Sequence, residues 1–303
     1  MAAANRANVF TASQKVIKKH YSSAGADKRN VVEQLVFAAI LENAPRKVAD
    51  ECFEVMQKEY IDWNEIRVTS VAELSEMFAK HPAPEGAATR VKTLLQNIFE
   101  SVYGYDLEGM KKGNQGKAVA QIEKYGATPF VVGYVTQHGL GGHAIPVDSA
   151  LVNLMFVLGA ISDKEMDKLA VPGIERAIPK TKGVEYSDMI HELAVDFQGA
   201  PFSKKIRDLL LEISPDAKSR FPKRVAEEPA AEPEKKEESS KKAAPKKATT
   251  KKAAPKQEEP AEEAQKKKAT TKKTTKKTTT KAAAKKSTAT KKSSTGITKK
   301  KPK

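Results

Sequence analysis

The sequence predicts an all-α domain followed by a basic tail. Apolar residues recur at helical spacing through most of the chain, and the composition changes abruptly near Arg224. After Arg224, Pro, Ala, Lys, Thr and Glu dominate, and such a segment cannot bury enough apolar surface to offset the entropy of ordering. We therefore expect an N-terminal extension (residues 1–28), a helical domain (29–224) and a disordered tail (225–303).

The most apolar helix is predicted over Asn30–Glu42. Its apolar residues cover so much of the helical circumference that we expect a deeply buried core helix. Pro45 opens a second helix, because proline is well tolerated at a first helical position. The segment FVVGYV (130–135) is rich in β-branched and aromatic residues, but no second strand is available to pair with it. We read it as a buried helix that begins at Pro129.

Capping patterns and apolar periodicity mark the remaining helices. Ser70 with Glu73, and Ser162 with Glu165, have the spacing of a capping box. A short helix is also expected near Ser13 to Tyr21. Further helices are predicted from helical periodicity over Ala87–Val102, Lys117–Lys124, Ile190–Phe197 and Ile206–Ile213.

The net charge of +16 lies at the end of the chain. Residues 266–303 hold 16 lysines and no acidic residue, whereas residues 1–224 hold 29 basic and 28 acidic residues. This lysine-rich composition resembles the tails of linker histones and bacterial histone-like proteins, and it suits loose contact with DNA phosphates. The lysines that we expect to bind DNA are Lys266, Lys267, Lys268, Lys272, Lys273, Lys276 and Lys277.

Several classes of protein are not expected. The single cysteine, Cys52, cannot form a disulfide framework, and no apolar leader or membrane-spanning run is present. His138 and His143 lack a third ligand at usable spacing, so no metal or cofactor is predicted. We expect a monomeric intracellular protein of the bacterial cytoplasm and nucleoid, or of the nucleus in a eukaryote.

The stretch AIPVDSALVNLMFVLG places Asp148 at a junction between a loop and an apolar helix. Its carboxylate is suited to cap that helix by accepting backbone N–H groups. The letters AIPVDS also resemble the catalytic loop of the helix-hairpin-helix DNA glycosylases of the endonuclease III superfamily. That resemblance covers residues 30–199 and implies a two-lobed helical domain, with Asp148 as its catalytic carboxylate.

Other positions of the family's motifs can be matched to this sequence, and some of them hold a different residue here. Asn43 falls where the family has a glutamine that fills the gap left by an extruded base, and Gly126 matches the first glycine of the DNA-binding hairpin. The second hairpin glycine falls on Thr128. The family's nucleophilic lysine falls on Phe130, and one cysteine cannot ligate an iron–sulfur cluster.

Two functions remain open from the sequence. Asp148 alone can stabilise the cationic sugar formed when a base is released, which implies a monofunctional glycosylase without lyase activity. Lyase chemistry needs an amine, which Phe130 does not supply. His143 is a candidate contact to DNA. The alternative is a non-catalytic protein that binds double-stranded DNA or organises the nucleoid, with this fold as its scaffold.

Overall fold

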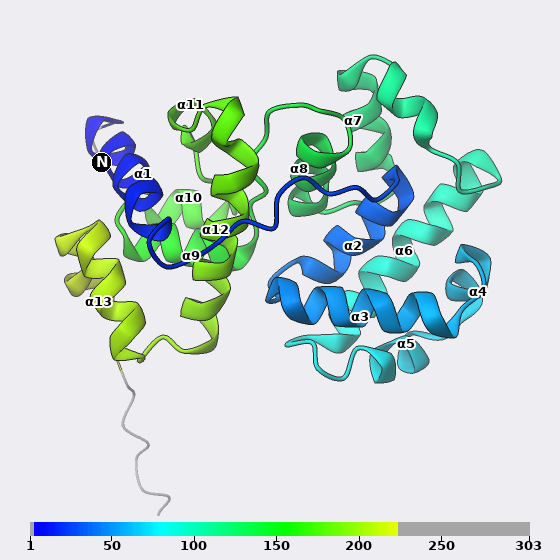
Figure 1. Cartoon of the computed structure of the whole chain (residues 1–303), viewed down its shortest axis with the longest axis horizontal. Helices are drawn as coiled ribbons and strands as arrows, with labels where there is room; N and C mark the ends of the chain where they lie inside the picture. Colours follow the sequence, from blue (N-terminus) through cyan, green and yellow to red (C-terminus); the bar gives the residue numbers. More distant parts are fainter. Residues whose placement is uncertain (1–2, 224–303) are drawn as a thin grey trace, which may run out of the picture. The chain divides into compact units, whose positions relative to one another are not determined.

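The computed structural model describes residues 3–223 of the 303-residue chain, and these residues are helical without any strand (Figure 1). The predicted tail, with all of its candidate DNA-binding lysines, lies outside the described residues. The helices form two hydrophobic cores, and we name the two groups the α2 lobe and the α12 lobe after their most buried long helices. Within residues 3–223, no helix is long and apolar enough to cross a membrane.

The α2 lobe surrounds α2 (Val31–Leu41), in which every residue except Glu33 is buried. This confirms the predicted core helix. An Asn30 capping box fixes where the helix begins. The elements packed around it are α3 (Arg46–Glu59), α4 (Trp63–Val68), α5 (Val71–Met77), α6 (Pro84–Val102), η1 (Glu108–Lys112), α7 (Gln115–Lys124) and α8 (Pro129–His138).

The α12 lobe contains both ends of the described chain. It is built from α1 (Ala3–Ile17), α9 (Ser149–Val157), α10 (Asp163–Asp167), α11 (Ile174–Ala177), α12 (Lys180–Gly199), α13 (Lys204–Ile213) and η2 (Pro215–Arg220). Phe10 and Ile17 of α1 are buried in its core. The first 28 residues therefore contribute a core helix, and residues 18–30 then cross to the α2 lobe as the blue trace in Figure 1.

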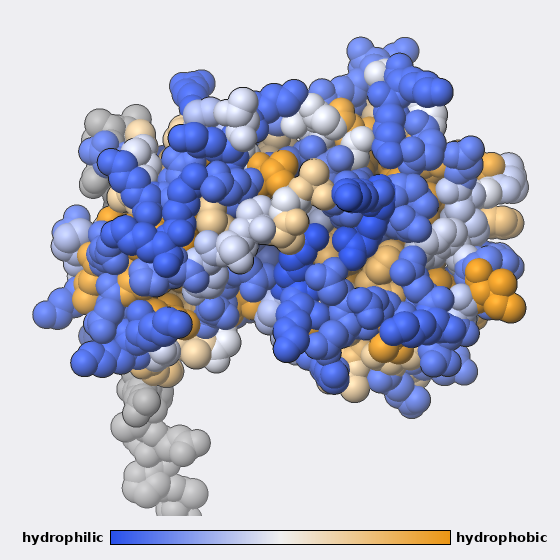
Figure 2. All heavy atoms as spheres, viewed as in Figure 1, coloured by the Kyte–Doolittle hydropathy of each residue, from blue (hydrophilic) through white to orange (hydrophobic). Residues whose placement is uncertain are grey.

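Local signals in the sequence give the helix boundaries. Both predicted capping boxes are present, at Ser70 with Glu73 and at Ser162 with Glu165. The segment FVVGYV is helical within α8, with Pro129 in its first turn, as predicted. The helix predicted near Ser13 to Tyr21 is α1, which begins at Ala3 and ends at Ile17. Its apolar residues pack into the core of the α12 lobe. Polar side chains cover most of the face drawn in Figure 2, where apolar atoms form small separate patches.

Candidate functional site

The turn between α7 and α8 is a helical hairpin. Gly126 has φ +78°, a left-handed conformation that favours glycine, and its N–H donates to Glu123 O at 3.0 Å. Asn97 Nδ2 braces the turn by donating to Tyr125 O at 2.9 Å. Thr128 then caps α8, because its Oγ1 accepts from Val131 N at 3.3 Å. The threonine at the second glycine position thus begins the second helix of the hairpin.

The hairpin leaves backbone donors without a partner. Within residues 3–223, the N–H groups of Ala127, Thr128 and Phe130 make no hydrogen bond to the protein. Free N–H groups at a helix N-terminus bind phosphate, because the helix dipole adds positive potential there. Thr128 Oγ1 also donates to Glu42 Oε2 at 2.8 Å, which holds the hairpin against the end of α2.

Replacing Gly126 with alanine is expected to destabilise the protein by about 1–2 kcal/mol, because a side chain at φ > 0 is strained. An added Cβ would also lie 3.1 Å from Asn97 Nδ2. Gly109→Ala is a matched control, since a Cβ there meets no atom within 4 Å and its φ is not positive. Urea unfolding of the two variants measures the difference, and equal losses would contradict a strained hairpin.

Asp148 caps α9 from a fully buried position. Its side chain has 0% exposure. Oδ1 accepts from Leu151 N at 2.8 Å, and Oδ2 accepts from Asn43 N at 3.1 Å. The capping role predicted from the sequence is therefore present. The second bond joins the start of α9 to the chain that follows α2, and so links the two lobes.

His191 of α12 completes this buried group. Its Nδ1 lies 3.3 Å from Asp148 Oδ2, and its Nε2 lies 3.0 Å from Ala44 O. A carbonyl oxygen only accepts, so Nε2 carries a proton. The 3.3 Å separation of Nδ1 from the carboxylate oxygen brings the two groups into ion-pair contact. A protonated His191 therefore neutralises Asp148.

The pKa values of the pair support this charged arrangement. Burial opposes the negative charge of Asp148, but the contact with His191 and the backbone donors outweigh it, so the pKa of Asp148 is lowered. Burial likewise opposes a charged His191, and the adjacent carboxylate outweighs it, so the pKa of His191 is raised. Both groups are thus charged in the same pH range.

Asn43 faces α9 rather than solvent. It has φ +61°, and its Oδ1 accepts from Ser149 Oγ at 2.7 Å and from Ala150 N at 3.0 Å. Asparagine tolerates this left-handed conformation better than most residues do. The side chain that we expected to reach DNA is therefore engaged in capping α9, beside the bond from its own N–H to Asp148.

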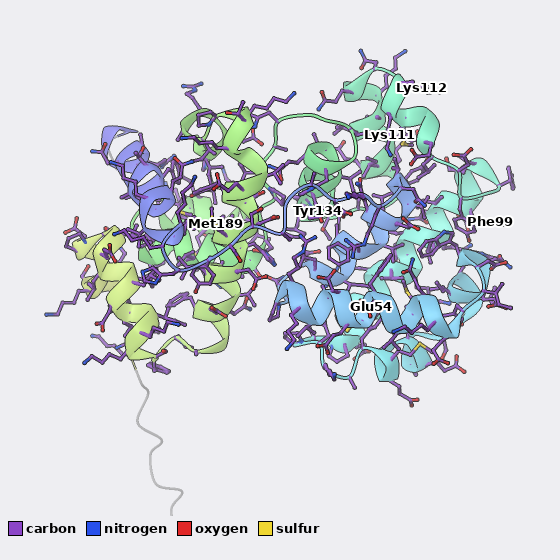
Figure 3. All side chains as sticks on the ribbon, in the orientation of Figure 1. Glu54, Phe99, Lys111, Lys112, Tyr134 and Met189 are labelled. Carbon is purple, nitrogen blue, oxygen red and sulfur yellow. The ribbon has the colours of Figure 1, made fainter. Side chains whose placement is uncertain are left out.

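Aromatic side chains pack around His191, the partner of Asp148. Phe130 is 2% exposed, and its ring centroid lies 5.2 Å from that of His191. Tyr134, labelled in Figure 3, stacks on His138 at 4.2 Å, and its hydroxyl donates to Asp27 Oδ2 at 3.0 Å. No lysine occupies the Phe130 position, and neither ring is free to stack on a base.

The cavity that remains between these rings is small. It has a volume of about 20 Å³ and is lined by Phe130, Tyr134 and His191 among others. This volume suffices for about one water molecule, whereas pockets for small molecules are typically ~300–1,000 Å³. A larger open groove of about 810 Å³ lies along α1 and α11, but neither Asp148 nor the hairpin lines it.

The remaining predicted positions lie apart from Asp148. His143 is half-buried in the loop before α9, and its Nε2 lies 2.8 Å from Glu175 O. Cys52 is buried in α3 as a free thiol. Among residues 3–223, no three His, Cys, Asp or Glu side chains are grouped as they would be to hold a metal ion.

His191 and Glu42 are the two residues of this site that sequence reasoning missed. Each lies on a helix far from its partner in the chain, with Glu42 at the end of α2 and His191 in the middle of α12. A polar residue inside an otherwise apolar helical face, such as His191 within MIHELA, is the signal that marks a buried polar contact.

No protein-family model and no curated protein sequence matches the chain. Among solved structures, it is similar to endonuclease III in a trapped covalent intermediate with DNA, an estranged-adenine complex. The TM-score is 0.50 at 13% identity, over 73% of this chain and 100% of that chain. A thermostable thymine-DNA glycosylase matches with a TM-score of 0.44 at 14% identity, over 63% of this chain and 86% of that chain. The predicted fold class, an all-α helix-hairpin-helix DNA glycosylase-like domain, is confirmed.

Proposed function

We propose that this protein binds double-stranded DNA and uses the glycosylase fold as a scaffold, without excising a base. The observation that carries the proposal is the α7–α8 hairpin, whose free N–H groups suit a phosphate. A fold alone does not define a function. The choice between DNA binding and base excision therefore depends on Asp148 and the residues around it. In this proposal the protein acts as a monomer on the nucleoid, or in the nucleus of a eukaryote.

The central residues favour binding over chemistry. A glycosylase carboxylate stabilises positive charge on the sugar, so it must face the flipped nucleotide. Asp148 has no exposed side-chain surface, both of its oxygens accept hydrogen bonds, and His191 neutralises it. The cavity beside His191, of about 20 Å³, does not admit a base. These groups hold the two lobes together instead.

A second candidate is the monofunctional glycosylase. Its supporting observation is that the pKa of Asp148 is lowered, so the carboxylate is charged at neutral pH and lies at the start of α9 as the family motif implies. Catalysis would require Phe130 and His191 to move away and open a base pocket. Phe130 occupies the position of the family's nucleophilic lysine and supplies no amine there, so no lyase step is expected.

One experiment separates the two candidates. Full-length protein is incubated with duplexes that each carry a different damaged or mismatched base, and alkali then reveals abasic sites. We expect every duplex to be bound, with no base released and no adduct trapped by borohydride. Release of a base that is abolished by Asp148→Asn would establish the glycosylase. Failure to bind any duplex at low salt would overturn the binding proposal itself.

A further inference from the structure

The glycine-rich loop of residues 139–143 lies at the end of α8 opposite the hairpin. The ten residues of α8 separate the two by about 15 Å, from the rise of 1.5 Å per residue. Gly142 lies so close to Gln115 at the start of α7 that a side chain at position 142 would overlap it. His143 contacts Glu175 O at 2.8 Å and lies beside Gly183 of α12. The loop therefore joins the start of α7 to the starts of α11 and α12 (Figure 1).

Exposed basic side chains surround this loop, and we call them the loop strip. None of them forms an ion pair within residues 3–223, and all are exposed. In Figure 3, Lys112 lies at the outer edge of the molecule near α7. The members of the loop strip are Lys112, Lys117, Arg176, Lys180 and Lys182.

Three acidic residues near the loop strip have partners outside it. Glu108 pairs with Lys111 at 2.7 Å and accepts from Val31 N. Glu175 accepts from Ile145 N at 3.3 Å, and Glu185 pairs with Lys18 at 2.8 Å. Glu123 and Glu175 are exposed and form no ion pair in the described part of the chain, and the five basic residues of the loop strip outnumber them.

The basic residues at the starts of α7 and α12 do not stabilise these helices. Lys117 lies in the first turn of α7, and Lys180 and Lys182 lie in the first turn of α12. Neither first turn contains an acidic residue. The helix dipole places positive potential at a helix N-terminus, so cations there weaken the helix whereas anions strengthen it. An anionic partner at this surface would reverse the unfavourable interaction.

We propose that the loop strip binds the phosphates of a second DNA duplex, so that one protein molecule bridges two duplexes. This inference rests on the proposed function, in which the hairpin binds the first duplex. The N–H groups at the start of α8 point along the helix axis toward its N-terminus and away from the loop strip. The hairpin and the loop strip can therefore bind phosphates at opposite ends of α8.

A co-capture assay with full-length protein tests the proposal. One duplex is fixed to beads, and the amount of a second, fluorescent duplex retained by bound protein is measured. The test variant combines Lys112→Glu, Lys117→Glu, Lys180→Glu and Lys182→Glu. The control combines Lys15→Glu, Lys164→Glu, Lys168→Glu and Lys218→Glu, which are exposed lysines without an ion pair among the described residues, on α1, α10, η2 and the residue after α10. Both variants change the net charge equally and keep the tail.

We expect the test variant to retain ~10-fold less of the second duplex than the control, because several phosphate contacts are lost. Misfolding is not the expected cause, since glutamate in the first turns of α7 and α12 interacts favourably with the helix dipole. Urea unfolding of both variants checks this point. Equal retention by the two variants would overturn the loop strip as a DNA surface.

Crosslinking locates the contact independently. Cys52 is 3% exposed, so a thiol-reactive photo-crosslinker labels an introduced cysteine selectively. We expect Lys182→Cys in the loop strip and Lys124→Cys beside the hairpin to crosslink to duplex DNA, and Lys168→Cys to crosslink far less. Crosslinking through residue 124 but not residue 182 refutes bridging and leaves the proposed function standing. Absence of crosslinks at all three positions, with no binding, refutes both.

Discussion

Asp148→Ala is expected to lower the free energy of unfolding by about 3–5 kcal/mol, because it removes one partner of a buried ion pair. His191 then loses the carboxylate that raises its pKa, so burial favours the neutral imidazole, whose Nε2 can still donate to Ala44 O. The variant also loses the cap of α9 and the bond from Asn43 N that joins the lobes. Urea or thermal unfolding, followed by circular dichroism, measures the loss.

Asp62→Ala is the matched control for the capping part of this loss. Asp62 caps α4 through Asn64 N and Glu65 N from an exposed position, and it has no histidine partner. Removing such a cap costs about 0.5–2 kcal/mol. If Asp148→Ala costs no more than Asp62→Ala, the carboxylate is only a helix cap, and the proposed link between the lobes is wrong.

The pH dependence of stability follows from the same pair. The folded-state pKa of Asp148 is lowered, so its contribution is present above about pH 4 and is lost as pH falls through the folded pKa. The folded-state pKa of His191 is raised, so its contribution is complete below about pH 6.5 and is lost as pH rises through the folded pKa. The pair therefore contributes most between these two limits.

The difference in stability between wild type and Asp148→Ala should be largest in that window and shrink on either side of it. A double-mutant cycle with His191→Gln isolates the coupling, because the glutamine amide can still donate to Ala44 O while lacking the positive charge. A coupling energy that does not change with pH would show that His191 is not charged in the folded protein.

Local signals explain how much of the fold was predictable from the sequence. The helical assignment of FVVGYV depended on Pro129 and on the absence of a partner strand, and α8 confirms it. The capping box of Ser70 was readable because all of its atoms lie within four residues. The burial of α1 was not predicted, because the surface that it covers is formed by helices more than 100 residues later in the chain.

The same distinction applies to the candidate site. Asp148 was recognisable as a helix cap because its partner Leu151 is three residues away. Its bond to Asn43 N spans 105 residues, and its contact with His191 spans two separate helices, so no local pattern marks either one. The packing of Phe130 against His191 was also not predictable from a local pattern, because the two residues meet only when the lobes pack together. The sequence motif therefore identified Asp148, but it did not identify His191 as the residue that neutralises its charge.

Deleting residues 225–303 is expected to produce the largest change in DNA affinity. Of the 54 basic and 38 acidic residues in the chain, 25 and 10 follow Arg224, so the deletion leaves a nearly neutral protein. Each neutralised phosphate contributes about 0.9 to the slope of log affinity against log salt, and six to ten contacts change the affinity by ~10³–10⁵ between 50 and 200 mM salt. We expect the truncated protein to bind far more weakly at 50 mM salt and to lose most of that slope.

Fluorescence anisotropy of a labelled duplex, titrated at several salt concentrations, measures both quantities. The control keeps the full length and replaces the seven lysines between Lys266 and Lys277 with glutamine, which removes charge without shortening the chain. If charge is the cause, this control loses part of the slope in proportion to its lost lysines. The free N–H groups of the hairpin carry no net charge, so the binding that survives the deletion should keep only the smaller salt slope that the loop strip contributes, and it should fall further in Gly126→Ala. Equal salt slopes for full-length and truncated protein would instead place the DNA-binding charge within residues 3–223, where the basic residues of the loop strip are exposed and form no ion pair.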